Sequence, residues 1–266
     1  MNKSHIQQRD EFIRLRRQRM PKGSVLAKLA QDKLKELYNA RGIDPFSPQY
    51  VKSHCDELLD ELLKIEFELY KQQEQEINTE LLWQIMENSL PTKSLTKNRL
   101  EQHIKGKFGE LQNFYKSISQ SRVARAGGSL QNHIVYIFNI LGYPFEVQEE
   151  IDGRPDFILP NAALYHENPG ECILVTAKRT LRERWRQIII EGFMSPQYFL
   201  ITIDEKQTEH NLREMAGHRI YLVVPERLKL NIQNYEEAGN VIGIKSFFEG
   251  YLDPAMVRWH RARIIL

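Results

Sequence analysis

Apolar residues in the first part of the chain recur every three or four positions, which is the spacing of one face of an α-helix. This pattern predicts four helices, over about residues 24–42, 53–70, 79–90 and 94–117. Ser24 is a suitable N-cap for the first helix, which is expected to end toward Gly42. We expect these apolar stripes to pack into a core, and no residue in this part has a spacing that indicates chemistry.

The pattern changes after Gly127 and Gly128. One more helix is predicted over residues 129–141, and beyond it short apolar runs alternate with turns. Helices are also predicted over residues 181–193 and 209–216. The apolar runs that predict strands cover residues 144–148, 156–159, 172–176, 198–202 and 220–224.

Strands that alternate with helices indicate an α/β fold with a central mixed β-sheet flanked by helices, here preceded by an all-helical N-terminal part. A chain of 266 residues can bury one large core, or one core and a smaller unit. We place an N-terminal helical domain at residues 1–117 and a second domain at residues 118–266.

The overall composition gives little information about binding partners, whereas the distribution of charge along the chain gives more. The formal net charge is only +2, so bulk charge does not indicate a nucleic-acid partner. Residues 1–22 are strongly basic, and a second basic cluster covers residues 178–186. Each cluster is either a solvated surface or a contact for an acidic partner such as DNA phosphate.

Cys55 and Cys172 have neither a metal-ligand spacing nor the number needed for a disulfide framework. The chain begins with charged residues and has no apolar run of membrane-spanning length. These features favour a cytoplasmic protein without a membrane partner.

Asp156 and Lys178 form the first candidate site. Asp156 follows Pro155 at the start of one predicted strand, and Lys178 follows the end of the next. Adjacent strands can bring such residues together at one edge of a sheet. The pair suits phosphodiester hydrolysis, because the carboxylate can hold a divalent cation and the lysine can orient the attacking water and stabilise negative charge.

A magnesium ion is usually held by one or two protein carboxylates together with phosphate and water. The position two before Lys178 is Thr176, so a second strand carboxylate is absent there. Glu191, near the end of the following helix, is the expected replacement. Taken singly, Asp156 fits an ordinary strand-start carboxylate and Glu191 an exposed helix residue; the combination with Lys178 favours a site.

Arg182, Glu183 and Arg184 are consecutive at the start of that helix. Arginine can donate two hydrogen bonds to guanine O6 and N7, and glutamate can accept one from cytosine N4. The triplet therefore fits a G·C-rich half-site, and the alternative is a charged helix surface with internal ion pairs. Thr180 is a candidate N-cap of this helix.

These residues resemble the PD-(D/E)xK nuclease superfamily, and within it the branch of CCGG-recognising restriction enzymes related to EcoRII. The resemblance covers about residues 118–228. In size and layout the chain is similar to BsaWI and AgeI, whose sites have an uninterrupted CCGG centre. The elements that carry the resemblance are Arg125 to Ser129, Pro155-Asp156, Thr176-Ala177-Lys178, Arg182-Glu183-Arg184, Glu183 to Gln187 and Glu191.

The resemblance implies a restriction-endonuclease-like core and a type II restriction endonuclease that uses Mg²⁺ to cut double-stranded DNA. The implied site is palindromic with a CCGG core, such as the six-base WCCGGW. The roles it implies are catalysis by Asp156, Lys178 and Glu191, Mg²⁺ binding by Asp156 and Glu191, base recognition by Arg182, Glu183 and Arg184, and DNA-backbone or supporting contacts by Arg125, Arg154, Arg179 and Arg186.

A palindromic site also implies a homodimer, which can associate further, because two-fold symmetry gives each strand its own active site. The resemblance places the protein in a bacterial or archaeal cytoplasm, with a cognate methyltransferase that acts on the same site without needing direct contact.

The chain departs from the family pattern at one position. Several relatives carry a metal-site glutamate on the helix after the Arg-Ala-Gly element, and Gln131 stands at the matching position here. Nearby His133 is expected to be structural, because a single histidine on a mostly apolar helix rarely has a catalytic role.

Two other functions remain open at the level of sequence. A repair or structure-selective nuclease would share Asp156 and Lys178 but would have no need of the Arg-Glu-Arg triplet. A non-catalytic DNA-binding regulator would use the same helix but is expected to have a damaged active site. A scaffold protein with coincidental motifs is the remaining alternative.

Overall fold

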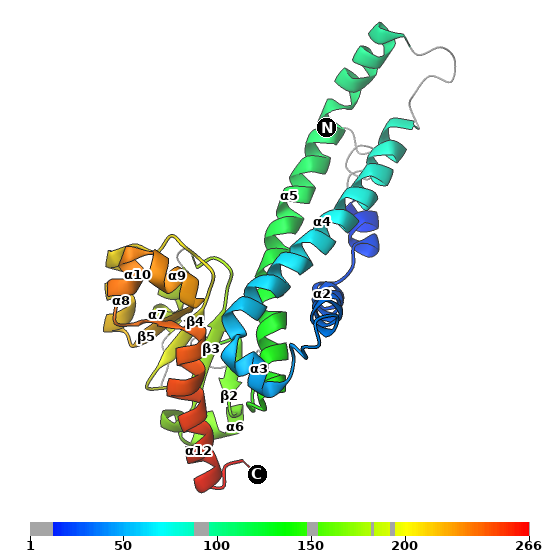
Figure 1. Ribbon diagram of the computed structural model, residues 1–266. Coiled ribbons are helices and arrows are strands. Elements are labelled where there is room, and N and C mark those ends of the chain that lie inside the picture. Colours follow the sequence, from blue (N-terminus) through cyan, green and yellow to red (C-terminus); the bar gives the residue numbers. More distant parts are fainter. Residues whose placement is uncertain (1–12, 88–95, 148–153, 182–183, 192–194, 266) are drawn as a thin grey trace.

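The computed structural model of this chain describes residues 13–87, 96–147, 154–181, 184–191 and 195–265 (Figure 1). In the described part, no helix is both long enough and apolar enough to cross a membrane. Cys55 and Cys172 are buried free thiols, in agreement with the expectation from sequence.

The N-terminal part is helical, as predicted. Residues 13–19 form a short helix, followed by α2 (Gly23–Asn39), α3 (Pro48–Ser53), α4 (Cys55–Glu87) and α5 (Lys97–Leu141). Helices α4 and α5 run beside each other and extend well beyond the body that contains the sheet (Figure 1). Helix α2 packs against both of them.

The boundaries of these helices differ from the sequence predictions. Helix α4 is continuous over 33 residues where two helices were expected. Helix α5 is continuous over 45 residues and joins the helices predicted over residues 94–117 and 129–141. Glycine inside a helix costs only about 1 kcal/mol relative to alanine, so Gly127 and Gly128 do not end α5. The predicted domain boundary at residues 117 and 118 falls inside this helix and stays a prediction.

The predicted N-cap of α2 is wrong. The helix begins at Gly23, and Lys22 occupies the capping position without a side-chain hydrogen bond. Gly42 lies beyond its end with φ of 74°, a conformation that glycine adopts without steric cost.

Six strands form one mixed sheet in the order β1-β2-β3-β4-β5-β6. The pairs β1–β2 and β2–β3 are antiparallel, and β3 to β6 run parallel. The predicted mixed sheet is therefore confirmed, and the short β6 was not predicted. The strands are β1 (Glu146–Val147), β2 (Phe157–Leu159), β3 (Ile173–Ala177), β4 (Tyr198–Ile201), β5 (Ile220–Val224) and β6 (Val241–Gly243).

Helices cover both faces of the sheet (Figure 1). The predicted helix over residues 181–193 corresponds to α7 (Arg184–Glu191), and that over 209–216 corresponds to α8 (Glu209–Gly217). The remaining helical elements were not predicted: α6 (Ala162–Glu167), η1 (Pro169–Glu171), α9 (Glu226–Asn231), α10 (Gln233–Glu237), α11 (Ile244–Phe247), η2 (Phe248–Leu252) and α12 (Asp253–Arg261).

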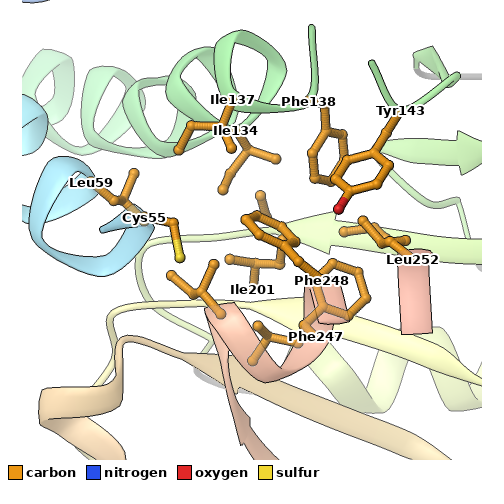
Figure 2. Close-up of a cluster of buried hydrophobic side chains, with 14 of the residues drawn as sticks. Cys55, Leu59, Ile134, Ile137, Phe138, Tyr143, Ile201, Phe247, Phe248 and Leu252 are labelled. Atoms are coloured by element: carbon orange, nitrogen blue, oxygen red, sulfur yellow. The ribbon is translucent and has the colours of Figure 1, made fainter. Parts of the chain in front are cut away.

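Alternate strand residues enter two separate cores because successive side chains point to opposite faces of a sheet. Val175 and Ile201 join the core shared with α4, α5 and η2, whereas Leu174 and Leu200 join the core under α7 and α8. Figure 2 shows the first core, where Phe138 of α5 and Phe248 of η2 lie close together. Burial on both faces explains why the strands are continuous apolar runs rather than alternating patterns.

Two buried polar clusters join the N-terminal helices. Glu74 of α4 receives hydrogen bonds from Arg16 (2.9 Å), from Tyr70 and from Arg122 of α5 (2.6 Å). Closer to the sheet, Glu66 of α4 lies 2.7 Å from Nε2 of His133 and accepts a hydrogen bond from Ser129. The structural role expected for His133 agrees with its complete burial in this cluster.

Candidate active site

Asp156 and Lys178 lie together at one end of the sheet. Asp156 immediately precedes β2 and Lys178 immediately follows β3, and these strands are antiparallel, with Phe157 opposite Val175. The start of β2 is therefore beside the end of β3. The ammonium nitrogen of Lys178 donates to Oδ1 of Asp156 over 2.9 Å, so the proximity predicted for this pair is observed.

The Asp156 carboxylate is held on both oxygens. Its Oδ2 accepts a hydrogen bond of 2.9 Å from the backbone N–H of Ala177, in addition to the bond between Oδ1 and Lys178. The side chains of Asp156 and Lys178 retain 12% and 17% of their exposure, so the pair is mostly desolvated but still reachable. In such surroundings charges interact more strongly than they do in water.

Thr176 lies two positions before Lys178, where a second strand carboxylate is absent. Its hydroxyl oxygen accepts a hydrogen bond of 3.3 Å from the backbone N–H of Asp156 and lies 2.8 Å from the hydroxyl of Tyr198. All three residues are buried. The threonine hydroxyl therefore positions the backbone of Asp156, a function that sequence reasoning missed because it considered only metal ligands at that position.

The segment after Lys178 is attached to the end of β4. The backbone N–H of Lys178 donates to the carbonyl oxygen of Ile201 over 2.9 Å, and the hydroxyl of Thr202 donates to the carbonyl oxygen of Arg179 over 3.4 Å. The backbone N–H of Leu181 donates to Oδ2 of Asp204 over 2.9 Å. Asp204 was also missed by sequence reasoning.

The predicted base-reading triplet is described only in part. Arg182 and Glu183 lie outside the described residues, and Arg184 begins α7 but its side chain is not described. The predicted capping of this helix by Thr180 depends on the same stretch and is not tested.

Glu191 is the last residue of α7, and the structure describes its backbone but not its side chain. Trp185 and Ile188 bury this helix against the sheet. Glu191 follows Ile188 by three positions, the spacing of one helix face. Its convergence with Asp156 and Lys178 stays a prediction.

The predicted supporting arginines have different surroundings. Arg154 is exposed and has a φ of 37°, and Arg179 is partly exposed beside Lys178. The guanidinium of Arg186 lies 4.8 Å from the ring centre of Trp185 and 3.6 Å from a carboxylate oxygen of Glu214. The side chain of Arg125 is outside the description.

The oxygen atoms at this edge of the sheet are of the type that magnesium binds. The Asp156 carboxylate supplies hard oxygen ligands, which Mg²⁺ prefers. In the described part of the chain, no three histidine, cysteine or acidic side chains form a metal-binding group. Gln131 is partly exposed on α5 and contributes no negative charge. The contribution of a second carboxylate by Glu191 stays a prediction from the sequence.

Two solved structures with the same fold are complexes with DNA. The protein is similar to Ecl18kI in a structure described as metal-depleted Ecl18kI in complex with uncleaved, modified DNA, with a TM-score of 0.80, 18% identity, and coverage of 94% of this chain and 84% of that one. It is also similar to PspGI in a complex with substrate DNA, with a TM-score of 0.60, 18% identity, and coverage of 90% and 94%. The predicted restriction-endonuclease-like core is confirmed.

Curated relatives match a shorter stretch. The chain is 35% identical over 140 residues to the type II restriction enzyme EcoRII of Escherichia coli, covering 49% of this chain and 34% of that enzyme. It is 26% identical over 119 residues to the type II restriction enzyme SsoII of Shigella sonnei, covering 40% and 39%. The chain therefore spans between a third and two fifths of the length of these relatives.

A family-level match covers more of the chain. The family described as EcoRII C terminal matches residues 89–248, which include β1 to β6 and the Asp156–Lys178 pair. This stretch is more than half of the 266 residues. The protein belongs to the EcoRII C-terminal family.

Proposed function

We propose that this protein is a type II restriction endonuclease that hydrolyses phosphodiester bonds of double-stranded DNA. The observation that carries the proposal is the contact of 2.9 Å between the Lys178 ammonium and the Asp156 carboxylate at an accessible edge of the sheet. Its relatives EcoRII and SsoII are type II restriction enzymes, which supports the same conclusion.

We further propose that Mg²⁺ is the metal and that Asp156 and Glu191 hold it. When bound, the cation supplies Lewis-acid stabilisation of negative charge on the scissile phosphate. Lys178 orients a water molecule for in-line attack on phosphorus and stabilises the developing charge through its ammonium group. The water oxygen bonds to phosphorus as the bond between phosphorus and the 3′ oxygen breaks, and a proton from the water passes through solvent to the 3′ oxygen. The products are a 3′-hydroxyl and a 5′-phosphate at the nick.

For sequence recognition, we propose that Arg182, Glu183 and Arg184 enter the major groove and read C·G pairs. Each good bidentate contact contributes about 1–3 kcal/mol of discrimination against the wrong base. The proposed site is a palindrome with a CCGG core and six bases in all, such as WCCGGW, by resemblance to BsaWI and AgeI. A homodimer, with or without further association, would give each strand one active site.

Phosphate contacts would position the protein without specifying sequence. Arg154 and Arg179 lie close in sequence to Asp156 and Lys178 and carry charge at this edge. In the basic N-terminal segment, Arg16 and Arg19 are engaged with carboxylates of α4, so part of that segment has a structural role. We also propose a cognate methyltransferase that modifies the same site.

A magnesium-dependent digest of linear plasmid DNA, followed by sequencing of the fragment ends, tests this proposal. Discrete fragments whose ends share a CCGG core are expected, and the ends also give the flanking bases and the position of the cut. Discrete fragments with another shared sequence would overturn the CCGG assignment alone. Smearing, or nicking at junctions, would indicate a repair or structure-selective nuclease instead.

Two variants complete this test. Lys178→Met removes the ammonium group while retaining an unbranched side chain, so cleavage should be lost and cognate binding largely kept. Lys105→Met is the matched control, because Lys105 pairs with Glu101 on the exposed surface of α5. A wild-type protein that binds DNA specifically but never cuts it would support the regulator hypothesis.

A further inference from the structure

Asp204 is a buried acid outside the Asp156–Lys178 pair. It follows β4 and is 8% exposed. Its Oδ2 accepts hydrogen bonds from the backbone N–H of Leu181 (2.9 Å) and from the side-chain amide of Gln207 (3.1 Å). Its Oδ1 accepts one from the backbone N–H of Lys206 (3.0 Å). A carboxylate that accepts several N–H groups in a buried place is a strong and directional anchor.

The anchor is itself held in place. The backbone N–H of Asp204 donates to the hydroxyl of Thr202 over 3.0 Å, and its carbonyl oxygen accepts from the hydroxyl of Tyr235 over 2.6 Å. That tyrosine hydroxyl also accepts from the backbone N–H of Gln207 over 3.3 Å. Because both Tyr235 and Gln207 are buried, the position of the Asp204 carboxylate is determined by several elements at once.

Asp204 holds the end of the segment Lys178–Leu181, which follows β3. Leu181 is 23 positions away in sequence and is fixed twice, by its N–H to Asp204 and by its side chain, which is 1% exposed in the core under α7. Leu181 immediately precedes the Arg182-Glu183-Arg184 triplet. The same segment begins with Lys178, whose N–H is bonded to the end of β4.

We propose that Asp204 is a positioning residue for sequence recognition, which fixes Leu181, the residue before the base-reading triplet, relative to Lys178. This inference rests on the proposed function, since it assumes that the triplet reads bases. The three N–H groups that donate to its carboxylate all come from the segments that it joins, and among the described residues Asp204 belongs to no metal-binding group of three side chains, so we assign it a supporting role.

The expected effect is on discrimination and not on DNA binding in general. Bidentate contacts to guanine need donors held in hydrogen-bonding geometry, whereas phosphate contacts tolerate displacement. Asp204→Asn keeps one acceptor oxygen but turns an NH₂ group toward an N–H donor. We expect the ratio of cognate to single-mismatch affinity to fall about tenfold, which corresponds to about 1.4 kcal/mol. Affinity for random DNA should remain unchanged.

The experiment measures equilibrium binding of full-length protein to cognate, single-mismatch and random duplexes without magnesium, and then cleavage of the same duplexes with magnesium. Tyr235→Phe is a milder second variant, because it removes only the hydroxyl that supports Asp204 and keeps the buried ring. It should lower discrimination in the same direction by a smaller factor. If Asp204→Asn does not fold, this variant decides the question.

Asp56→Asn is the matched control. Asp56 also accepts a backbone N–H from a distant segment, Glu226, over 3.1 Å, but it belongs to α4 and is not bonded to the Lys178–Leu181 segment. Its substitution should leave the cognate-to-mismatch ratio unchanged.

The outcomes separate this inference from the proposed function. If the wild-type protein discriminates between duplexes but Asp204→Asn and Tyr235→Phe keep the full ratio, the positioning role is overturned and the nuclease assignment stands. If the wild-type protein shows neither discrimination nor magnesium-dependent cutting, both proposals fall. A reduced ratio with normal affinity for random DNA supports the role of Asp204.

Discussion

Lys178 and Asp156 are 22 positions apart in sequence, yet the lysine ammonium lies 2.9 Å from one oxygen of the aspartate carboxylate. The contact exists because the start of β2 and the end of β3 meet at one sheet edge. A backbone N–H from Ala177 holds the other carboxylate oxygen at the same distance. The pairing of β2 with β3 therefore brings the two residues together.

This arrangement predicts which substitution of Asp156 is informative. Asp156→Ala would leave the Lys178 ammonium and the Ala177 N–H without their acceptor, so it mixes loss of function with loss of stability. Asp156→Asn keeps an oxygen for the Ala177 N–H, but it removes the charge and turns an NH₂ group toward the Lys178 ammonium. We expect cleavage to fall at least about 100-fold, with a smaller loss of melting temperature than Asp156→Ala causes. Normal cleavage by Asp156→Asn would remove this residue from the site.

Glu191 gives the complementary test, because its contribution is predicted only from sequence. Glu191→Gln is expected to abolish magnesium-dependent cleavage and to leave metal-free binding of cognate DNA intact, since the carboxylate is needed only to hold the cation. Cleavage should be measured over a range of magnesium concentrations. Cleavage by Glu191→Gln that matches the wild type at every concentration would contradict the two-carboxylate site.

The elements that sequence predicted well are those whose pattern is local. The run from Ile220 to Val224 was predicted with its observed bounds, because it is continuously apolar and ends at a proline. The strand β6 was missed because its apolar run is only Val241 and Ile242, and Gly243 then leads directly into α11. Helices α4 and α5 were each predicted in two pieces, because glycine and polar residues were taken as ends although a long helix tolerates them.

In the candidate site, too, the residues predicted from the sequence are those with a local pattern. The meeting of Asp156 and Lys178 was predicted because each residue lies at the end of a recognisable strand. The roles of Thr176 and Asp204 were missed because they depend on hydrogen bonds between residues about twenty positions apart, such as the bond from Leu181 to Asp204. Strand register and loop path decide such contacts, and neither is readable from a local pattern.

Arg154 provides a test of phosphate contact with a matched control. Arg154 and Arg219 are both exposed arginines with positive φ, at 37° and 59°. Side chains are disfavoured in this region, whereas glycine enters it readily but also gains freedom in the unfolded chain. Arg154→Gly and Arg219→Gly should therefore leave the free energy of unfolding unchanged or raise it by up to about 1 kcal/mol.

The two variants should differ in DNA binding. Arg154 lies two positions before Asp156, whereas Arg219 lies between α8 and β5. Arg154→Gly is expected to lower the slope of log affinity against log salt by about one, and Arg219→Gly to leave it unchanged. Binding titrations at several salt concentrations measure both slopes, and equal slopes for the two variants would argue against phosphate contact by Arg154.

Glu74 is expected to be important for the stability of the N-terminal helices. The Arg16–Glu74 pair is nearly inaccessible, with side-chain exposures of 4% and 3%. Glu74→Gln would leave the buried Arg16 guanidinium without its counter-charge, so unfolding free energy should fall by about 3–5 kcal/mol. The control is Glu80→Gln, which breaks the exposed pair with Arg19 and should cost less than about 1 kcal/mol. Urea unfolding of both variants measures the difference, and equal losses would contradict the importance of burial.

Asp56 gives a prediction about pH. Burial raises the pKa of its carboxyl from 3.8 to about 6, opposed by a hydrogen bond from the backbone of Glu226 and assisted by the charges of Glu57 and Glu226. The folded protein thus retains this proton to a higher pH than the unfolded chain does. The contribution of Asp56 to stability is largest below about pH 4 and is lost as the pH rises through 6.

Asp56→Asn cannot ionise, but its amide oxygen can still accept the N–H of Glu226. At pH 8 the variant should therefore be more stable than the wild type by about 1–2 kcal/mol, a value reduced from the full pKa shift to allow for partial solvent screening. Because Asp56 is protonated in both states at pH 3, the advantage should disappear there. Thermal melts of both proteins at pH 3, 5 and 8 measure this trend. An advantage for Asp56→Asn that does not change with pH would show that the ionisation of Asp56 has no part in it.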